Sequence, residues 1–199
     1  MNDGLAVTVG VIAGVLNLCG TVPYVRDIFR HKTKPERAMW WVYAALFTVL
    51  FLAQFDADAG WLLVVTASYI LSALLIAILS VRYGYGTFHR RDTLSLVVAV
   101  IGLLVWLRLD EPLIAILVVI VVDLAGFWLT LVKTWHAPHT ETLIAWQLSC
   151  VTAVLSLFTV QSTTFTVLIY PIYAVLGTAF IVWMIMYRRT KVAEDKSDF

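Results

Sequence analysis

Long apolar segments alternate with short polar ones along the chain. Most of the apolar segments reach the roughly 20 residues that a helix needs to cross the hydrocarbon core of a bilayer, and a helix satisfies its own backbone hydrogen bonds there. The pattern therefore predicts seven membrane-spanning helices, of which the fourth is the shortest. Their ranges are Leu5–Phe29, Ala38–Phe55, Trp61–Val81, Thr93–Leu107, Leu113–Val132, Leu143–Val160 and Phe165–Met186.

The composition supports the same class of protein. Of the 199 residues, 61% are hydrophobic and only 14% are charged, whereas a soluble domain has about 45–50% apolar and about 25% charged residues. So few polar residues cannot cover the surface of a water-soluble globule of this size. The formal net charge of +1 does not favour a nucleic-acid partner. We therefore expect an integral membrane protein.

The basic residues are distributed unevenly over the predicted connections. Thirteen of the fourteen Lys and Arg residues fall in connections, or in the tail, that seven helices would place on one side of the membrane, and only Arg108 falls on the other. Lys and Arg concentrate in cytoplasmic loops. The distribution predicts an N-terminus outside and a C-terminus in the cytoplasm, with the plasma membrane as the expected location.

Residues of the first three predicted helices match residues of the last three at a nearly constant offset. At an offset of 104 to 106 positions the matched pairs are His31 with His136, Glu36 with Glu141, Trp41 with Trp146, Asn17 with Asp123, Gly20 with Gly126 and Tyr69 with Tyr173. These matches predict an internal repeat. A single linker helix between two triplets makes both triplets run in the same direction, which is a known transporter plan with the substrate site between the halves.

The repeat defines the expected organisation of the chain. We expect an all-α membrane protein in which two parallel three-helix bundles are joined by a linker helix, a 3+1+3 arrangement. The predicted boundaries are 1–83 for the first repeat, 84–110 for the linker helix, 111–187 for the second repeat and 188–199 for a cytoplasmic tail.

The end of the first helix carries a recognisable motif. Residues 20–33 read GTVPYVRDIFRHKT, with a proline late in the helix, an apolar turn, a basic residue and then a threonine. This resembles the signature of the PQ-loop and SWEET superfamily of seven-helix transporters. The chain departs from that signature at Tyr24, where the family has Gln, and the second copy, from Gly126 to Leu129, lacks the proline. The Asn residues that sugar-carrying members have in helices 3 and 7 are absent here, and Tyr69 and Tyr173 are the nearest polar residues. The resemblance implies the 3+1+3 fold and solute transport.

Asp123 is the first candidate for chemistry because it lies in the middle of a predicted span. A charged side chain at that depth costs about 2.5–3.5 kcal/mol or more, so such residues are functional candidates by default. Asp123 either binds substrate and couples transport to protons, or it hydrogen-bonds a neighbouring helix for packing. Its repeat mate, Asn17, would bring both side chains near one central axis. The resemblance agrees, since lysosomal PQ-loop transporters use an aspartate of helix 5 for proton coupling.

Other polar and aromatic residues are weighed by depth. Tyr69, Tyr173, Trp146 and Gln147 are expected to line a substrate path together with Asn17 and Asp123, although hydrogen bonds between helices would also explain them. Pro23 and Pro171 interrupt predicted helices, as hinges for alternating access or as tolerated kinks. An interfacial belt explains the tryptophans near span ends, which are Trp40, Trp41, Trp61, Trp106 and Trp135.

The leading hypothesis is a transporter that moves a small polar solute, such as a sugar, an amino acid or a vitamin-like molecule, by alternating access. The alternative is a membrane receptor or assembly factor that uses the same fold to bind a ligand or protein without moving it. We expect no enzyme activity and no cofactor. His136 and His139 are spaced like metal ligands, but no convincing ligand set surrounds them, so no metal site is expected. The expected partners are the solute and membrane lipid, and nothing in the sequence indicates an oligomer.

Overall fold

A computed structural model describes residues 3–85, 93, 97, 111–160 and 163–197. Within these residues the chain forms six α-helices and one short 3₁₀ helix. They are α1 (Asp3–Phe29), α2 (Arg37–Asp56), α3 (Leu62–Tyr83), α5 (Pro112–His136), η1 (Pro138–Thr140), α6 (Leu143–Ser156) and α7 (Phe165–Ser197). No strand occurs in this described part, which is therefore that of an all-α protein.

Six of the seven predicted segments coincide with a helix of the structure. The predicted fourth segment, Thr93–Leu107, lies outside the described residues apart from 93 and 97, so the count of seven stays a prediction. Five helices, α1, α2, α3, α5 and α7, are long and apolar enough to cross a membrane. Helix α6 is apolar but has only 14 residues. These helices indicate an integral membrane protein.

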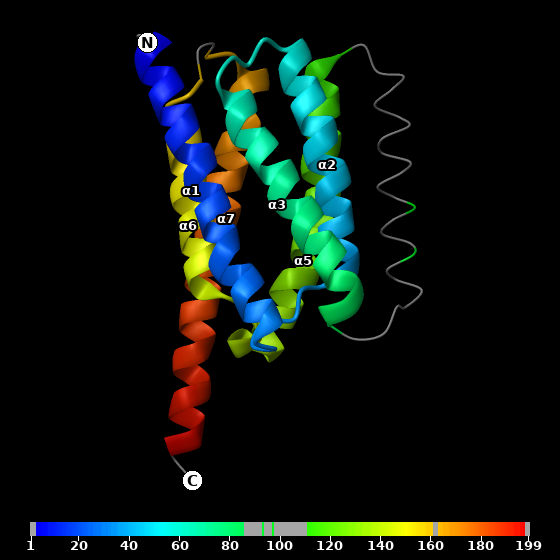
Figure 1. The fold of residues 1–199 in the computed structure, drawn as a ribbon, viewed down its shortest axis with the longest axis vertical. Helices are drawn as coiled ribbons and strands as arrows, with labels where there is room; N and C mark the ends of the chain where they lie inside the picture. Colours follow the sequence, from blue (N-terminus) through cyan, green and yellow to red (C-terminus); the bar gives the residue numbers. More distant parts are fainter. Residues whose placement is uncertain (1–2, 86–92, 94–96, 98–110, 161–162, 198–199) are drawn as a thin grey trace.

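Two boundaries differ from the sequence prediction. Helix α6 ends at Ser156 rather than at residue 160. Near this end, the hydroxyls of Ser156 and Thr159 each donate to the backbone carbonyl three residues earlier, which favours a turn over a continued helix. Helix α7 continues eleven residues past the predicted end at Met186, to Ser197. Its Arg188 lies over the ring of Trp135 at 4.3 Å. Figure 1 shows the resulting extension of α7 beyond the other helices.

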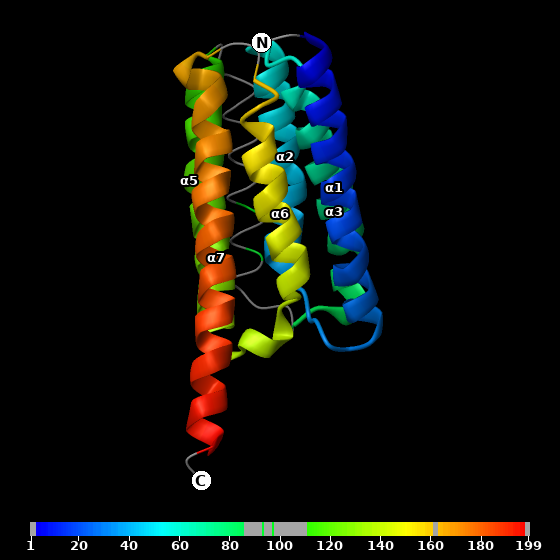
Figure 2. The same ribbon diagram turned by 90° about the vertical axis from the view of Figure 1, so that its left-hand side faces the viewer.

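The six described helices form a closed ring, and in each triplet the third helix packs against the other two. Helix α3 packs against both α1 and α2, and helix α7 packs against both α5 and α6. Contacts between α1 and α6 and between α2 and α5 join the two triplets, as the two views in Figures 1 and 2 show. The predicted domain boundaries stay predictions, because the linker segment lies outside the described residues.

The two ends of the bundle differ in charge. Helices α1, α3, α5 and α7 run towards the same end (Figure 1), which we call the basic end because Arg26, Arg37 and Arg82 stand near it. The opposite end, called the acidic end, carries Asp56 and Glu111 at the limits of α2 and α5.

Helix α1 approaches the α2–α3 connection closely at Gly10, where a Cβ would lie 3.0 Å from the backbone carbonyl oxygen of Trp61. We expect Gly10→Val to lower the free energy of unfolding by about 1–3 kcal/mol, the usual cost of overpacking, because a backbone atom cannot rotate away. Gly4 is a matched control on the same helix, since a Cβ there meets no atom within 4 Å. Thermal unfolding in detergent measures both. Equal stabilities of Gly10→Val and Gly4→Val would contradict this packing.

Candidate functional site

A cavity of about 130 Å³ lies between the two triplets, and all six α-helices contribute to its lining. It therefore has the position that the repeat predicts for a substrate site. Its lining residues are Asn17, Gly20, Thr21 and Tyr24 of α1; Trp40, Tyr43 and Phe47 of α2; Tyr69, Ser72 and Ile76 of α3; Asp123 and Phe127 of α5; Ala145, Trp146 and Ser149 of α6; and Tyr170, Tyr173, Ala174, Gly177 and Thr178 of α7.

Asp123 is the charged residue of this lining. Only 7% of its surface is exposed, and its Oδ1 atom has no hydrogen-bond partner in the described part of the chain. Its carboxyl group lies beside the hydroxyls of Tyr43 and Tyr173, each of which can donate a hydrogen bond. A buried carboxyl oxygen without a donor is costly, so Asp123 is kept as a candidate site residue.

Asn17 belongs to a small polar cluster on the α1–α3 side of the cavity. Its Nδ2 donates to Oγ of Ser72 at 3.0 Å, and the hydroxyls of Ser72 and Thr21 lie 2.7 Å apart. The Thr21 hydroxyl also lies 3.1 Å from the carbonyl oxygen of Asn17. These three side chains satisfy one another across the two helices. Asn17 thus serves packing between helices and also borders the cavity.

Aromatic rings form a continuous wall on one side of the cavity. The ring centroids of Tyr24 and Trp40 are 5.4 Å apart, those of Trp40 and Tyr43 5.7 Å, those of Tyr43 and Phe47 5.4 Å, and those of Phe47 and Tyr69 5.3 Å. This row runs from α1 across α2 to α3. The indole of Trp40 also lies beside the hydroxyl of Tyr24, and its Nε1 is buried.

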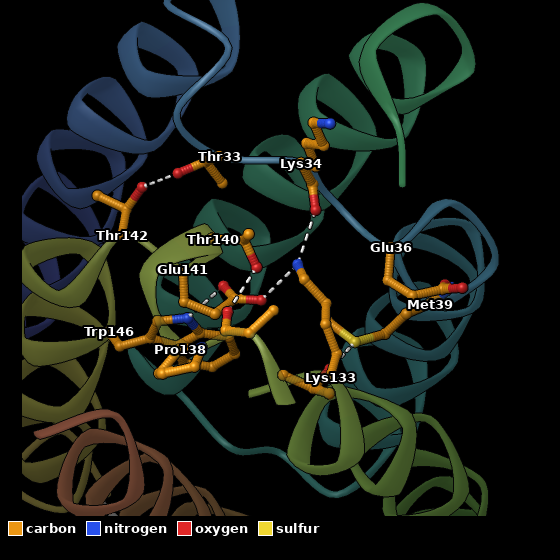
Figure 3. A network of polar contacts seen from close by, with 12 residues as sticks. Thr33, Lys34, Glu36, Met39, Lys133, Pro138, Thr140, Glu141, Thr142 and Trp146 are labelled. Carbon is orange, nitrogen blue, oxygen red and sulfur yellow. Dashed lines mark hydrogen bonds and ion pairs between the residues drawn. The ribbon is translucent and has the colours of Figure 1, made fainter. Parts of the chain in front are cut away.

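Trp146 connects the cavity to a buried ion pair at the basic end (Figure 3). Its Nε1 donates to Oε2 of Glu141 at 3.0 Å, and Oε1 of Glu141 lies 2.7 Å from Nζ of Lys133. The two charged side chains are only 5% and 2% exposed. Nζ of Lys133 also donates to the backbone carbonyl of Lys34 at 2.7 Å. The ion pair thereby joins α5, the α5–α6 connection and the α1–α2 connection.

Two further contacts join the connections around this ion pair. The hydroxyls of Thr33 and Thr142 lie 2.6 Å apart (Figure 3), and Nη2 of Arg189 donates to the carbonyl of Glu141 at 2.6 Å. The connections of both triplets and the end of α7 are therefore tied together at the basic end. We call Lys133, Glu141, Thr33 and Thr142 the basic-end network.

The acidic end of the cavity is bordered by apolar side chains instead. The buried cluster there comprises Ala13, Ala59, Leu62, Val65, Val160 and Val167, with Tyr69 packed against it. Because Tyr69 also lines the cavity, the apolar cluster and the cavity are direct neighbours. A polar network at one end and an apolar cluster at the other therefore flank the cavity.

The structure brings together five of the six residues that the sequence nominates for substrate binding. Asn17, Tyr69, Asp123, Trp146 and Tyr173 all line the cavity. The sixth, Gln147, is half-buried and is not among the described lining residues.

The two prolines, Trp128 and the two loop histidines are not among the described lining residues. Pro23 and Pro171 lie inside α1 and α7. Trp128 is 65% exposed on the outside of α5. His136 and His139 belong to no group of metal-ligand type in the described part of the chain.

Sequence reasoning missed part of the site. Trp40 was assigned to an interfacial belt, but it lines the cavity. Tyr43 was not singled out, although it lies beside Asp123. The Lys133–Glu141 pair was also missed. A signal for it existed, because Glu141 is the repeat mate of Glu36, and both residues stand at the start of a helix on the basic side.

Comparisons of the chain with protein-family models, with curated proteins and with solved structures find no match. The resemblance to the PQ-loop and SWEET superfamily rests on residues 20–33 and on the helix pattern.

Proposed function

We propose that this chain is a membrane transporter that moves a small polar solute through the central cavity by alternating access. The observation that carries the proposal is the position of Asp123. Its carboxyl oxygen Oδ1 is buried without a hydrogen-bond partner among the described residues, in a cavity to which helices of both triplets contribute. The hydroxyls of Tyr43 and Tyr173 beside this carboxyl group link α5 to α2 and α7, and they leave Oδ1 without a partner in the described part of the chain. A buried acidic side chain at mid-depth with incomplete hydrogen bonding is a candidate for solute or proton binding.

The two ends of the cavity suggest how access would alternate. At the basic end, the basic-end network would have to separate to open the path. At the acidic end, the apolar cluster around Val65 and Val167 would have to part. Because different contacts hold the two ends closed, one end could open while the other stays closed. Each of Pro23 and Pro171 removes a backbone hydrogen bond, in α1 and α7 respectively, and these two prolines are the proposed hinges.

The proposal includes a topology and a coupling ion. The linker helix would complete a 3+1+3 bundle of the PQ-loop and SWEET type, with the basic end in the cytoplasm and the N-terminus outside. Asp123 would take up a proton in one state and release it in the other. The proposed location is the plasma membrane.

Uptake into proteoliposomes tests this function. Purified protein is reconstituted and offered a panel of labelled sugars, amino acids, amines and vitamins, with and without a pH gradient. We expect saturable uptake of at least one solute and a change in its rate when the gradient is imposed. Saturable binding of a solute without uptake would contradict transport and would favour the receptor class.

A further inference from the structure

We propose that the solute of the central cavity is a small organic ammonium ion that binds to Asp123 and is surrounded by aromatic rings. This inference rests on the proposed function, because it names the substrate class of the same site. It follows from three observations, which are the buried charge balance, the composition of the lining and the size of the cavity.

The buried charge balance leaves one negative charge without a partner. Among the described residues, three charged side chains are buried, namely Asp123, Lys133 and Glu141. Lys133 and Glu141 form an ion pair with each other, so Lys133 does not serve as the counter-ion of Asp123. A buried carboxylate is stable only when it is paired or protonated. A bound cation would supply the missing positive charge.

The lining fits an organic cation better than an anion or a sugar. Nine of the twenty lining residues are aromatic, although aromatic residues make up only 13% of the chain. A cation is attracted to the face of an aromatic ring within about 6 Å of its centroid, and cages of this kind recognise quaternary ammonium groups. Among the described residues of the lining, none is a Lys, Arg or His that could pair with an anion. Its polar cluster of Asn17, Thr21 and Ser72 is already hydrogen-bonded internally.

The size of the cavity restricts the cation further. The volume is about 130 Å³, whereas a cavity of about 150 Å³ is sufficient for benzene. The solute therefore has about five to seven non-hydrogen atoms, as tetramethylammonium and choline do.

Binding of the ammonium ion and protonation of Asp123 exclude each other, because both neutralise the same carboxylate. The groups that face it are the neutral hydroxyls of Tyr43 from α2 and of Tyr173 from α7, and Tyr170 of α7 lines the same cavity. Binding of the cation would then displace a proton from the carboxyl group of Asp123, and release of the cation would require that this group take up a proton. Exchange of one proton for one monovalent cation follows from this single charge.

Calorimetric titration of the full-length protein tests the inference. The protein is kept in a maltoside detergent that contains no choline lipid, and the ligands are choline, tetramethylammonium and 3,3-dimethylbutan-1-ol, a neutral molecule with the shape of choline. We expect choline to bind at least tenfold more tightly than the neutral molecule, and its affinity to increase by up to tenfold per pH unit. Asp123→Asn should remove this preference. Trp128→Phe, on the outer face of α5, should keep it.

The comparison of choline with the neutral molecule uses the unaltered chain, so it does not depend on the folding of a variant. Equal affinity for the two would overturn the cation inference, and so would the absence of binding by both ammonium ions. Neither result would overturn the proposed function if the uptake experiment finds a neutral or an anionic solute.

Discussion

Lys133→Met will lower the free energy of unfolding by about 3–5 kcal/mol, because removing one partner of a buried ion pair leaves the other charge uncompensated. Glu141 would keep its hydrogen bond from Trp146 but would lose the ammonium group 2.7 Å away. The carbonyl of Lys34 would lose its donor as well. Because the pair ties both connections together at the basic end, the loss should appear as a large decrease in the melting temperature in detergent.

A double variant and a surface variant are the controls for this prediction. In Lys133→Met combined with Glu141→Gln, neither residue of the pair leaves a charge buried and the amide oxygen still accepts the Trp146 N–H, so most of the lost stability should return. Lys32→Met removes an exposed lysine and should change the stability by less than about 0.5 kcal/mol. If the single and double variants melt at the same temperature, the pair is not the element that holds this end together.

Asp123→Asn will reduce solute uptake at least about 30-fold at a fixed solute concentration, because losing one partner of a buried charge pair costs about 2–5 kcal/mol and each 1.4 kcal/mol is a factor of ten. The amide has nearly the same shape as the carboxyl group, so the packing against Tyr43 and Tyr173 should persist. Initial rates in proteoliposomes, normalised to the amount of reconstituted protein, measure the effect. The remaining uptake should no longer depend on a pH gradient.

The matched control for Asp123→Asn lies on the same helix. Trp128→Phe alters a side chain that points away from the cavity and is 65% exposed, and it should leave the uptake rate within twofold. Melting temperatures of both variants show that the bundle is intact. Uptake that is unchanged in Asp123→Asn would assign the aspartate to packing alone.

The hydrophobic pattern predicts the helices well because five of the described helices are apolar over a length that can cross a bilayer, and the shorter α6 is apolar as well. The two displaced boundaries depend on contacts that the pattern does not contain. The helix end at Ser156 depends on side-chain hydroxyls that bond to backbone carbonyls. The extension of α7 is accompanied by Arg189, which donates to carbonyls of the α5–α6 connection.

The candidate site is predictable where a residue is unusual for its depth. Asp123 and Asn17 are polar in the middle of apolar segments, and this alone nominates them. Trp40 lies near the start of α2, where an interfacial tryptophan and a cavity tryptophan look the same in sequence. Tyr43 gives no signal, because helices that are apolar on all faces do not reveal which face points inward.

The repeat marks Glu141 as a matched position, but it does not identify the partner of this glutamate. Lys133 stands at the end of α5, where a lysine ordinarily marks the cytoplasmic boundary of a span. Its partner Glu141 directly follows the 3₁₀ helix η1, which contains Pro138, in the α5–α6 connection. Only the tertiary fold shows that this turn returns the glutamate to within 2.7 Å of the lysine.

The central claim is that the cavity communicates with both sides of the membrane in turn, and the accessibility of a cysteine tests it most directly. Gly177 lines the cavity on α7, and its nearest neighbour is an atom of Phe127 that would lie 3.9 Å from a Cβ, so Gly177→Cys fits without strain. The variant is made with Cys19→Ser and Cys150→Ser, because both cysteines are free thiols. Right-side-out and inside-out vesicles are treated with a thiol reagent that cannot cross membranes.

The account predicts that Gly177→Cys is modified in both kinds of vesicle, and that a transported solute slows the modification. Modification from one side only, or from neither, would contradict alternating access.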